Sequence, residues 1–180
     1  MKNKSTSTKV ITGVLRTCFV NVFNPTAYQS EEPKYNLILL IPKSDSTTLA
    51  QVNAAIEAAK AKGKERFGAK FNTSNLYLPL QDGDEKRPDD PAFKDCFYIR
   101  TKSKNKPGVV DKDLNPILDQ AEVYSGCYIR ASINFFPYAN GQSGIGCGLG
   151  NVQKIRDGEP LGGPTTAEVD FADSAEDFLS

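Results

Sequence analysis

The chain has 180 residues with 39 % hydrophobic content, which suffices for one domain with a real core and is too short for two ordinary domains. Its 22 basic and 22 acidic residues cancel, and the absence of histidine removes the commonest general base and metal ligand. Without an apolar run of membrane-spanning length or a secretory leader pattern, we expect a soluble cytoplasmic protein.

In chain order, β-branched and aromatic residues predict a first long strand at 10–24 and a second at 34–42. The apolar spacing then changes to three and four residues, which predicts a helix over about 46–62 that ends near Gly63. The cations at the end of this segment favour the helix macrodipole, so they need no ligand to explain them.

Residues 68–96 are dense in Pro, Asp and Gly and predict a loop region with one short strand at 75–80. Further strands are expected at 97–104, 123–138 and 144–155. Five principal strands with one helix predict a mainly β fold, a small five-stranded β-barrel. We expect a flexible N-terminus at 1–9, the barrel domain at 10–158 and a disordered acidic tail at 159–180.

Two of the expected strands have one apolar face and one face of cations and aromatic rings. In an extended strand, residues two apart share a face, so Phe97, Ile99 and Thr101 would point inward. Cations contact phosphates, and rings stack on unpaired bases. Ordinary solvent-facing strands also carry Lys and Tyr, which is the alternative. The candidate DNA-binding residues, on strands expected to be neighbours, are Tyr98, Arg100, Lys102, Lys104, Lys106, Tyr128, Arg130, Phe136 and Tyr138.

Three other patterns remain, and the first two allow two interpretations each. Gly144, Gly146, Gly148 and Gly150 form a bare strand face, suited to a barrel seam or to the close approach of a nucleotide. Carboxylates at 82–90 could bind Mg²⁺ in a nuclease or could simply be a solvated loop. The four scattered cysteines indicate buried reduced thiols. No catalytic residue, metal site or cofactor is predicted.

The charge is unevenly distributed along the chain. Residues 1–156 contain all 22 basic residues and 22 − 7 = 15 acidic ones, because seven acids follow Arg156. Aromatic and apolar side chains among the terminal acids suit a peptide that docks on a partner protein, or one that lies in the protein's own basic groove. The candidate partner-binding residues of this tail are Asp170, Phe171, Asp173, Glu176, Asp177, Phe178 and Leu179.

The blocks "LPLQDGDEKRPDDPAF", "IRTKSKNKPGVVD", "VYSGCYIRASINFFPY" and "GIGCGLGNVQKIRDGEPLGG", followed by the acidic end, resemble the phage-encoded single-stranded DNA-binding proteins with an OB-fold core. The resemblance implies a protein of an infected bacterium that coats single-stranded DNA (ssDNA) in replication or recombination and recruits partners through its tail. The usual OB fold has its helix after the third strand, whereas the predicted helix follows the second. A metal-dependent nuclease and an OB-type interaction or annealing module remain alternatives.

Overall fold

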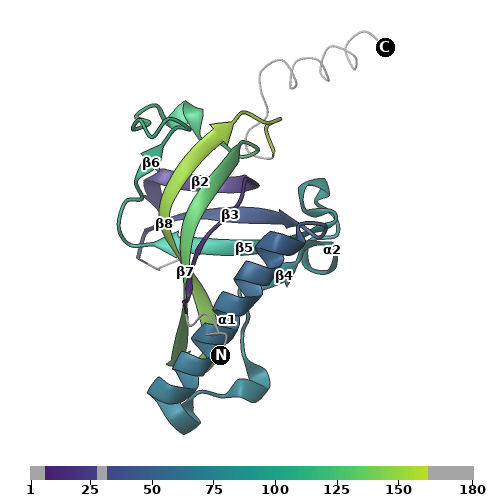
Figure 1. Cartoon of the computed structure of the whole chain (residues 1–180), viewed down its shortest axis with the longest axis vertical. Helices are drawn as coiled ribbons and strands as arrows, with labels where there is room; N and C mark the ends of the chain where they lie inside the picture. Colours follow the sequence, from purple (N-terminus) through teal and green to yellow (C-terminus); the bar gives the residue numbers. More distant parts are fainter. Residues whose placement is uncertain (1–6, 28–31, 162–180) are drawn as a thin grey trace, which may run out of the picture.

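The computed structural model describes residues 7–27 and 32–161. Within these residues eight strands form one sheet, and five of them close into a barrel (Figure 1). The strands are β1 (Lys9–Ile11), β2 (Leu15–Thr26), β3 (Lys34–Pro42), β4 (Leu80–Asp82), β5 (Cys96–Ser103), β6 (Val109–Val110), β7 (Tyr128–Asn140) and β8 (Gln142–Arg156). The helices are α1 (Ser46–Phe67) and α2 (Gly83–Lys86), with short 3-10 turns at Gly68–Lys70, Thr73–Asn75, Pro91–Phe93 and Gln120–Glu122.

The barrel follows the order β2, β3, β5, β8, β7 and returns to β2. Only the β5–β8 pair in this ring is parallel, and it is paired at Lys102 and Gly148. The other four pairs are antiparallel. A five-stranded barrel of this kind is the OB architecture, so the predicted fold class is confirmed.

The barrel interior is filled by alternate residues of its strands, as the period-2 pattern predicts. On β3, Leu37, Leu39 and Ile41 are buried in the main core, and β7 contributes Ile129 and Ile133 to the same core. Their neighbours in sequence therefore lie on the outer surface of the barrel. The four cysteines are free thiols, three of them buried and Cys96 half-buried.

The single strand predicted at 10–24 is wrong, because the chain breaks at Thr12–Val14 into β1 and β2. At the break, the Thr12 hydroxyl accepts the backbone N–H of Ala131 at 3.0 Å. This side-chain hydrogen bond replaces a bond of the strand ladder, so β1 and β2 pair separately with β7.

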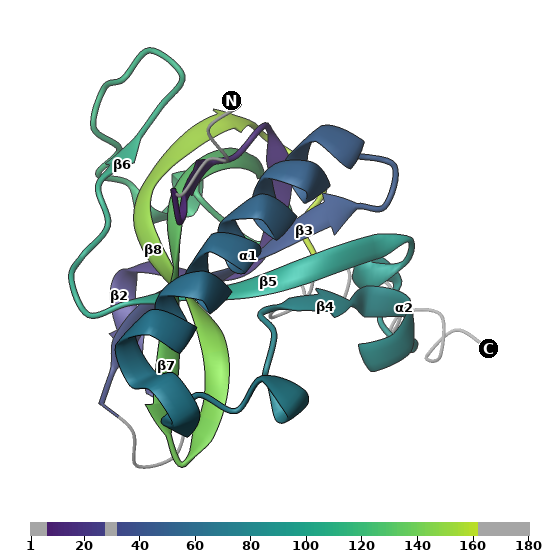
Figure 2. The same cartoon turned by 60° about the horizontal axis from the view of Figure 1, so that its bottom comes forward.

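Helix α1 begins as predicted, where the Asp45 carboxylate accepts the backbone N–H of Thr48 at 3.1 Å. It continues to Phe67, so the predicted end near Gly63 is wrong. Gly63 is buried, and a Cβ there would lie 2.6 Å from the Phe71 ring, so glycine serves close packing inside the helix. Figure 2 shows α1 crossing one end of the barrel beside the β7–β8 hairpin. The helix follows the second barrel strand, as the sequence indicates.

A second, smaller apolar cluster lies on the outside of the barrel. The segment that follows α2 folds back over β2, β3 and β5 and buries Phe93 completely. Beneath it are Cys18, Ile38, Leu40 and Tyr98. This segment therefore covers part of the outer face that the alternation pattern assigns to solvent.

After β8 the chain stays in contact with the barrel to the end of the described residues. The Leu161 N–H donates to the Ser125 carbonyl at 2.8 Å, and Arg16 donates to the Glu159 carbonyl. Residues 159–161 thus contact the barrel, and the tail candidates at 170–179 lie outside the described residues. Across 7–27 and 32–161, neither helix has the length and apolar character of a transmembrane segment.

Candidate nucleic-acid interface

Two adjoining hollows lie on the outer face of β3 and β5 and share Arg87 and Arg100. One, of about 630 Å³, extends toward the β2–β3 connection, and the other, of about 550 Å³, lies against the segment after α2. We call them together the outer groove. Its charged or aromatic lining residues are Phe19, Glu32, Lys34, Lys86, Arg87, Asp89, Asp90, Tyr98, Arg100 and Lys102.

The β3–β5 register places the cations of the groove. Lys102 lies opposite Asn36, and Arg100 lies opposite Ile38. Arg100 and Lys102 are both exposed, and neither forms an ion pair with a residue in the described ranges. Their buried neighbour Thr101 donates its hydroxyl to the Leu37 carbonyl at 2.9 Å. This hydrogen bond holds the Thr101 side of β5 toward the barrel interior. The predicted alternation along β5 is confirmed, and it directs Arg100 and Lys102 onto the groove.

The prediction that Tyr98 presents an exposed ring on this face is wrong. Tyr98 points outward as expected, but it is only 6 % exposed because Phe93 packs against it. The local pattern of β5 carries no information about a segment that covers it from outside. Tyr98 therefore belongs to the wall of the groove and is not available for stacking on a base.

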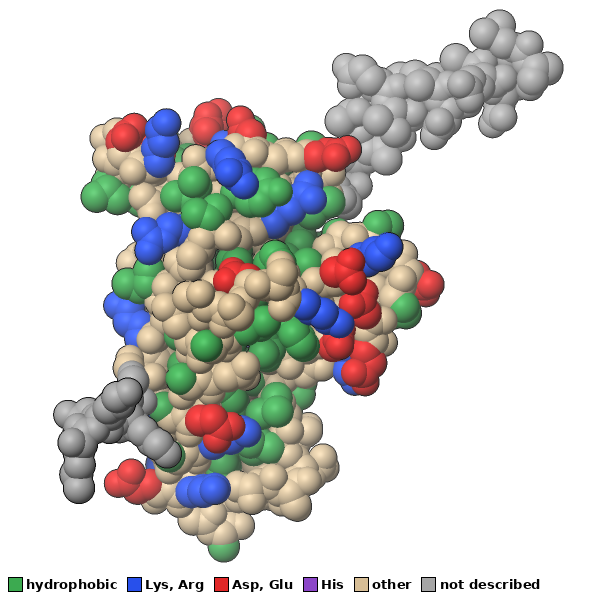
Figure 3. Space-filling model, turned by 45° about the vertical axis from the view of Figure 1, so that its right-hand side comes forward, with side chains coloured by type: hydrophobic (Ala, Val, Ile, Leu, Met, Phe, Trp, Pro, Cys, Tyr) green, Lys and Arg blue, Asp and Glu red, His purple; other side chains and the backbone are tan. Residues whose placement is uncertain are grey.

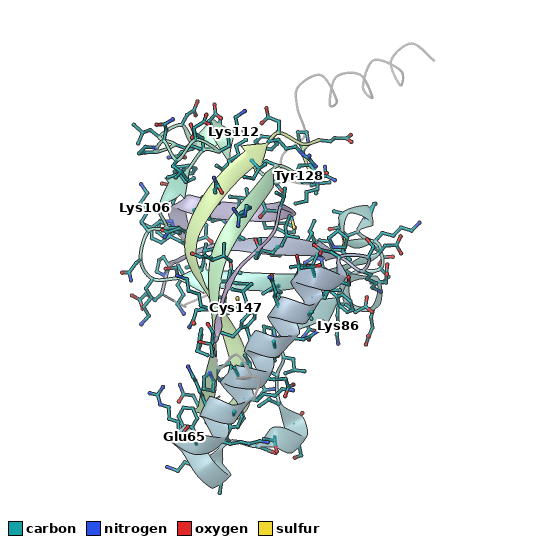
Figure 4. The ribbon with its side chains drawn as sticks, viewed as in Figure 1. Glu65, Lys86, Lys106, Lys112, Tyr128 and Cys147 are labelled. Atoms are coloured by element: carbon teal, nitrogen blue, oxygen red, sulfur yellow. The ribbon has the colours of Figure 1, made fainter. Side chains whose placement is uncertain are left out.

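Lys104 and Lys106 are exposed but lie beyond the end of β5 and do not line the groove. Lys106 is at the edge of the barrel opposite Lys86 (Figure 4). Their predicted contacts with DNA therefore require that the bound DNA continues past the groove.

The candidates on β7 lie on a different part of the barrel, because β8 separates β7 from β5. The expectation that the two strands are neighbours is wrong. Phe136 is 45 % exposed and its ring lies on β8, where a Cβ on Gly146 would be 2.5 Å from the ring. The half-buried ring of Tyr138 lies over Gly144 in the same way. The bare glycine face thus seats two aromatic rings.

The other two β7 candidates lie at the opposite end of the strand. Tyr128 is half-buried between two guanidinium groups, with Arg156 at 4.3 Å and Arg16 at 5.9 Å from its ring centroid. Arg130 is exposed, and its Nε donates to the Thr12 carbonyl at 3.0 Å. Figure 4 shows Tyr128 near one end of the barrel, far from the tip of the hairpin. The predicted β7 residues therefore form two separate groups.

The acidic loop residues have structural contacts. Lys43 bridges Asp82 at 2.9 Å and Asp84 at 2.8 Å, and the Lys43 ammonium lowers the pKa of both carboxyls. Asp90 accepts the N–H of Ala92 at 3.1 Å, which starts a short 3-10 turn. Figure 3 shows the acidic side chains grouped on the protrusion formed by α2 and its neighbouring turns. Among the described residues no group of His, Cys, Asp or Glu is arranged to hold a metal ion.

Sequence analysis does not identify four cationic or aromatic residues of the groove, namely Phe19, Lys34, Lys86 and Arg87. Phe19 is 45 % exposed although it lies within β2. The available signal was the run Cys18-Phe19-Val20, three consecutive apolar residues that interrupt the alternation of a strand. Arg87 belongs to the loop that the sequence presents as merely solvated.

A closed OB barrel with exposed cations in a hollow over its second and third strands has the features of an oligonucleotide-binding module. A family model described as the ssDNA-binding protein of Enterobacter phage Enc34 matches residues 8–179. Protein p50 of Acyrthosiphon pisum secondary endosymbiont phage 1 is 31 % identical over 170 residues, covering 88 % of this chain and 89 % of that protein. The chain therefore belongs to the Enc34 ssDNA-binding protein family.

Solved structures share the fold. The single-stranded DNA-binding protein from bacteriophage Enc34, in complex with ssDNA, is 24 % identical, with a TM-score of 0.76 over 86 % of this chain and 90 % of that chain. The single-stranded DNA binding protein gp2.5 of bacteriophage T7 is 15 % identical, with a TM-score of 0.63 over 93 % and 94 % of the two chains.

Proposed function

We propose that this protein binds ssDNA without sequence preference, through the outer groove, and performs no catalysis. The observation that carries the proposal is the pair Arg100 and Lys102, exposed and without ion-pair partners among the described residues. Unpaired cations at every second position of a strand can each contact a phosphate along an extended backbone. Membership of a phage ssDNA-binding family supports the choice of ligand.

In this proposal the remaining candidate residues contact the bound DNA where it continues beyond the groove. Phe136 and Tyr138 offer ring surface on the β7–β8 hairpin, and Lys104 and Lys106 continue the line of cations from β5. Tyr128 and Arg130 lie at the far end of β7 and would contact DNA only if the strand wraps around the barrel. Affinity then comes from phosphate contacts and base stacking, neither of which reads base identity.

The biological role that fits this activity is the coating of exposed single strands during phage DNA replication or recombination. In the same proposal, the acidic tail recruits replication or recombination proteins. The support is its composition, since Phe171, Phe178 and Leu179 stand among five acids in residues 164–180. Apolar anchors with a charged surround are the usual composition of a docking peptide.

The test compares two double variants that each remove two positive charges. Arg100→Ala with Lys102→Ala should weaken binding of a mixed-sequence oligonucleotide strongly. Lys64→Ala with Lys70→Ala, at exposed positions at the end of α1 and in the turn after it, should leave binding nearly unchanged. The slope of log affinity against log salt should become shallower by roughly 1.4 in the first variant only, about 0.7 for each lost phosphate contact.

Equal weakening in both double variants would mean that only net charge matters and that the groove is not the binding site. The same oligonucleotide, incubated with the protein and Mg²⁺, should keep its length. Shortening of the DNA would favour the nuclease, and a failure of the wild-type protein to bind DNA would favour an interaction module.

A further inference from the structure

Phe19 has a backbone conformation that residues with a side chain rarely adopt. Its φ is +51°, in the left-handed region, where a Cβ crowds the following carbonyl. It lies in the irregular part of β2, where the register with β3 shifts between Cys18 and Asn21. Such a conformation persists only where the surroundings impose it, and functional sites are where such conformations cluster.

The consequence of this bulge is that two consecutive side chains face the outside of the barrel. Cys18 enters the small outer cluster, and Phe19 stands beside it at the edge of the outer groove. Val20 then returns to the main core, so the strand resumes its alternation. The Phe19 N–H donates to the Ser125 hydroxyl at 3.2 Å, which holds the backbone of the bulge.

The ring of Phe19 is also held in place from the groove side. The guanidinium carbon of Arg87 lies 5.3 Å from the Phe19 ring centroid and 4.6 Å from that of the fully buried Phe93. Asp90 lies 3.8 Å from the same guanidinium group. Arg87 is thus fixed between a buried ring and an exposed one, and it orients the exposed ring without covering all of it.

We propose that Phe19, oriented by Arg87, is a base-stacking platform of the outer groove, and that its strained backbone is retained because it brings a ring to this position. The inference rests on the proposed function. A base has a planar face of its own, so stacking on Phe19 adds affinity without adding sequence preference. Arg100, which also lines both hollows, would contact a phosphate near the stacked base.

The first experiment separates the ring from the strain. Phe19→Ala and Phe19→Gly both remove the ring, and each should bind a mixed-sequence oligonucleotide roughly 5- to 150-fold more weakly than wild type. Phe19→Gly should melt at a higher temperature than Phe19→Ala, because glycine tolerates a positive φ. Wild-type affinity in both variants would contradict the stacking role of Phe19. A lower melting temperature for Phe19→Gly than for Phe19→Ala would contradict the claim that the backbone of Phe19 is strained.

The chain offers a matched control in Leu114. It also has a positive φ, +68°, and is 70 % exposed, but it lies in the loop after β6 and does not line the outer groove. Leu114→Gly should raise the melting temperature and leave DNA affinity unchanged. A loss of affinity in this variant equal to that of Phe19→Gly would show that the effect is unspecific and would overturn the assignment.

The second experiment detects the stacked base directly. The protein has no tryptophan, so Phe19→Trp introduces a single reporter at the platform. Its fluorescence should be quenched by an oligonucleotide with bases and much less by an abasic oligonucleotide of the same length and charge, while Leu114→Trp should respond to neither. If wild type binds DNA through Arg100 and Lys102 but Phe19→Trp responds equally to both oligonucleotides, this inference fails and the proposed function stands. If wild type does not bind, both fail.

Discussion

The ring of Tyr98 meets the ring of Phe93 edge-on, with 5.1 Å between the centroids and 88° between the planes. Edge-to-face pairs of buried rings contribute to stability beyond the area that they bury. This contact joins a barrel strand to the segment that covers it, and two members of the outer cluster, Tyr98 and Ile38, also line the outer groove.

Substitution of Tyr98 should mainly lower stability, whereas substitution of Phe136 should mainly weaken DNA binding. Tyr98→Ala should lower the free energy of unfolding by roughly 3–5 kcal/mol, because it empties a buried site. Phe136→Ala removes a ring that is 45 % exposed, so it should change stability by less than about 1 kcal/mol and weaken DNA binding. Urea unfolding and an oligonucleotide titration measure the two effects. Tyr98→Phe, which keeps the ring, is the control, and full stability of Tyr98→Ala would contradict the burial argument.

Gly63→Ala should destabilise the protein although alanine is the better helix former. The intrinsic gain is about 1 kcal/mol, but the new Cβ would meet the buried Phe71 ring at 2.6 Å, and overpacking of this kind costs roughly 1–3 kcal/mol. The exposed Ala54→Gly is the reverse control and should lose about 1 kcal/mol from propensity alone. Thermal unfolding decides the sign, and a higher melting temperature for Gly63→Ala would contradict the expectation.

Acidification should remove the contribution of the Lys43 bridge. The pKa values of Asp82 and Asp84 are lowered below the usual 3.8 in the folded protein, mainly by hydrogen bonds from Lys43. A depressed folded pKa stabilises the protein above the unfolded value, and this stabilisation disappears as the pH falls through the folded value. Lys43→Met should therefore be less stable than wild type at neutral pH, with a gap that narrows below about pH 4. A pH-independent gap in urea unfolding would rule out the electrostatic origin.

Removal of residues 164–180 should raise ssDNA affinity, most at low salt. The deletion removes five acids and changes the net charge from 0 to +5. Any competition between the tail and DNA for the outer groove then disappears. The same deletion should abolish capture of replication proteins from an infected-cell extract. Unchanged DNA affinity at low salt would contradict the competition.

Phe178→Ala separates the two proposed roles of the tail, because it keeps every charge. DNA affinity should remain at the wild-type value, while capture of replication proteins falls, since a docking peptide loses its anchor. Intact capture would show that the partners do not recognise this phenylalanine.

Local patterns in the sequence predict much of the barrel. The strand at 34–42 and the inward residues of β5 and β7 follow from alternation alone, because burial on one side of a strand repeats every second residue. The start of α1 follows from a capping residue and a change of period. These features depend on residues close together in the sequence.

The errors arise where a turn folds one segment back onto its neighbour. The alternation along β5 does not show that Phe93, five residues earlier, folds back over Tyr98, and the helical period does not show that Phe71, eight residues later, lies against Gly63. The bulge at Phe19 is a third case, since a positive φ on phenylalanine contradicts its local preference and depends on the packing around it. The part of the groove that was missed is therefore the part built by tertiary contacts.

The parallel pairing of β5 with β8 at a single position also determines how the barrel can move. Eight paired positions join β3 to β5, whereas Lys102 and Gly148 are the one registered pair that joins β5 to β8. Opening of the ring at this boundary separates the fewest paired positions, so amides that link β5 to β8 should exchange faster than amides that link β3 to β5. Lys102 lines the outer groove and stands on this boundary, so opening here would shift one edge of the groove while the β3–β5 ladder beneath it remains intact.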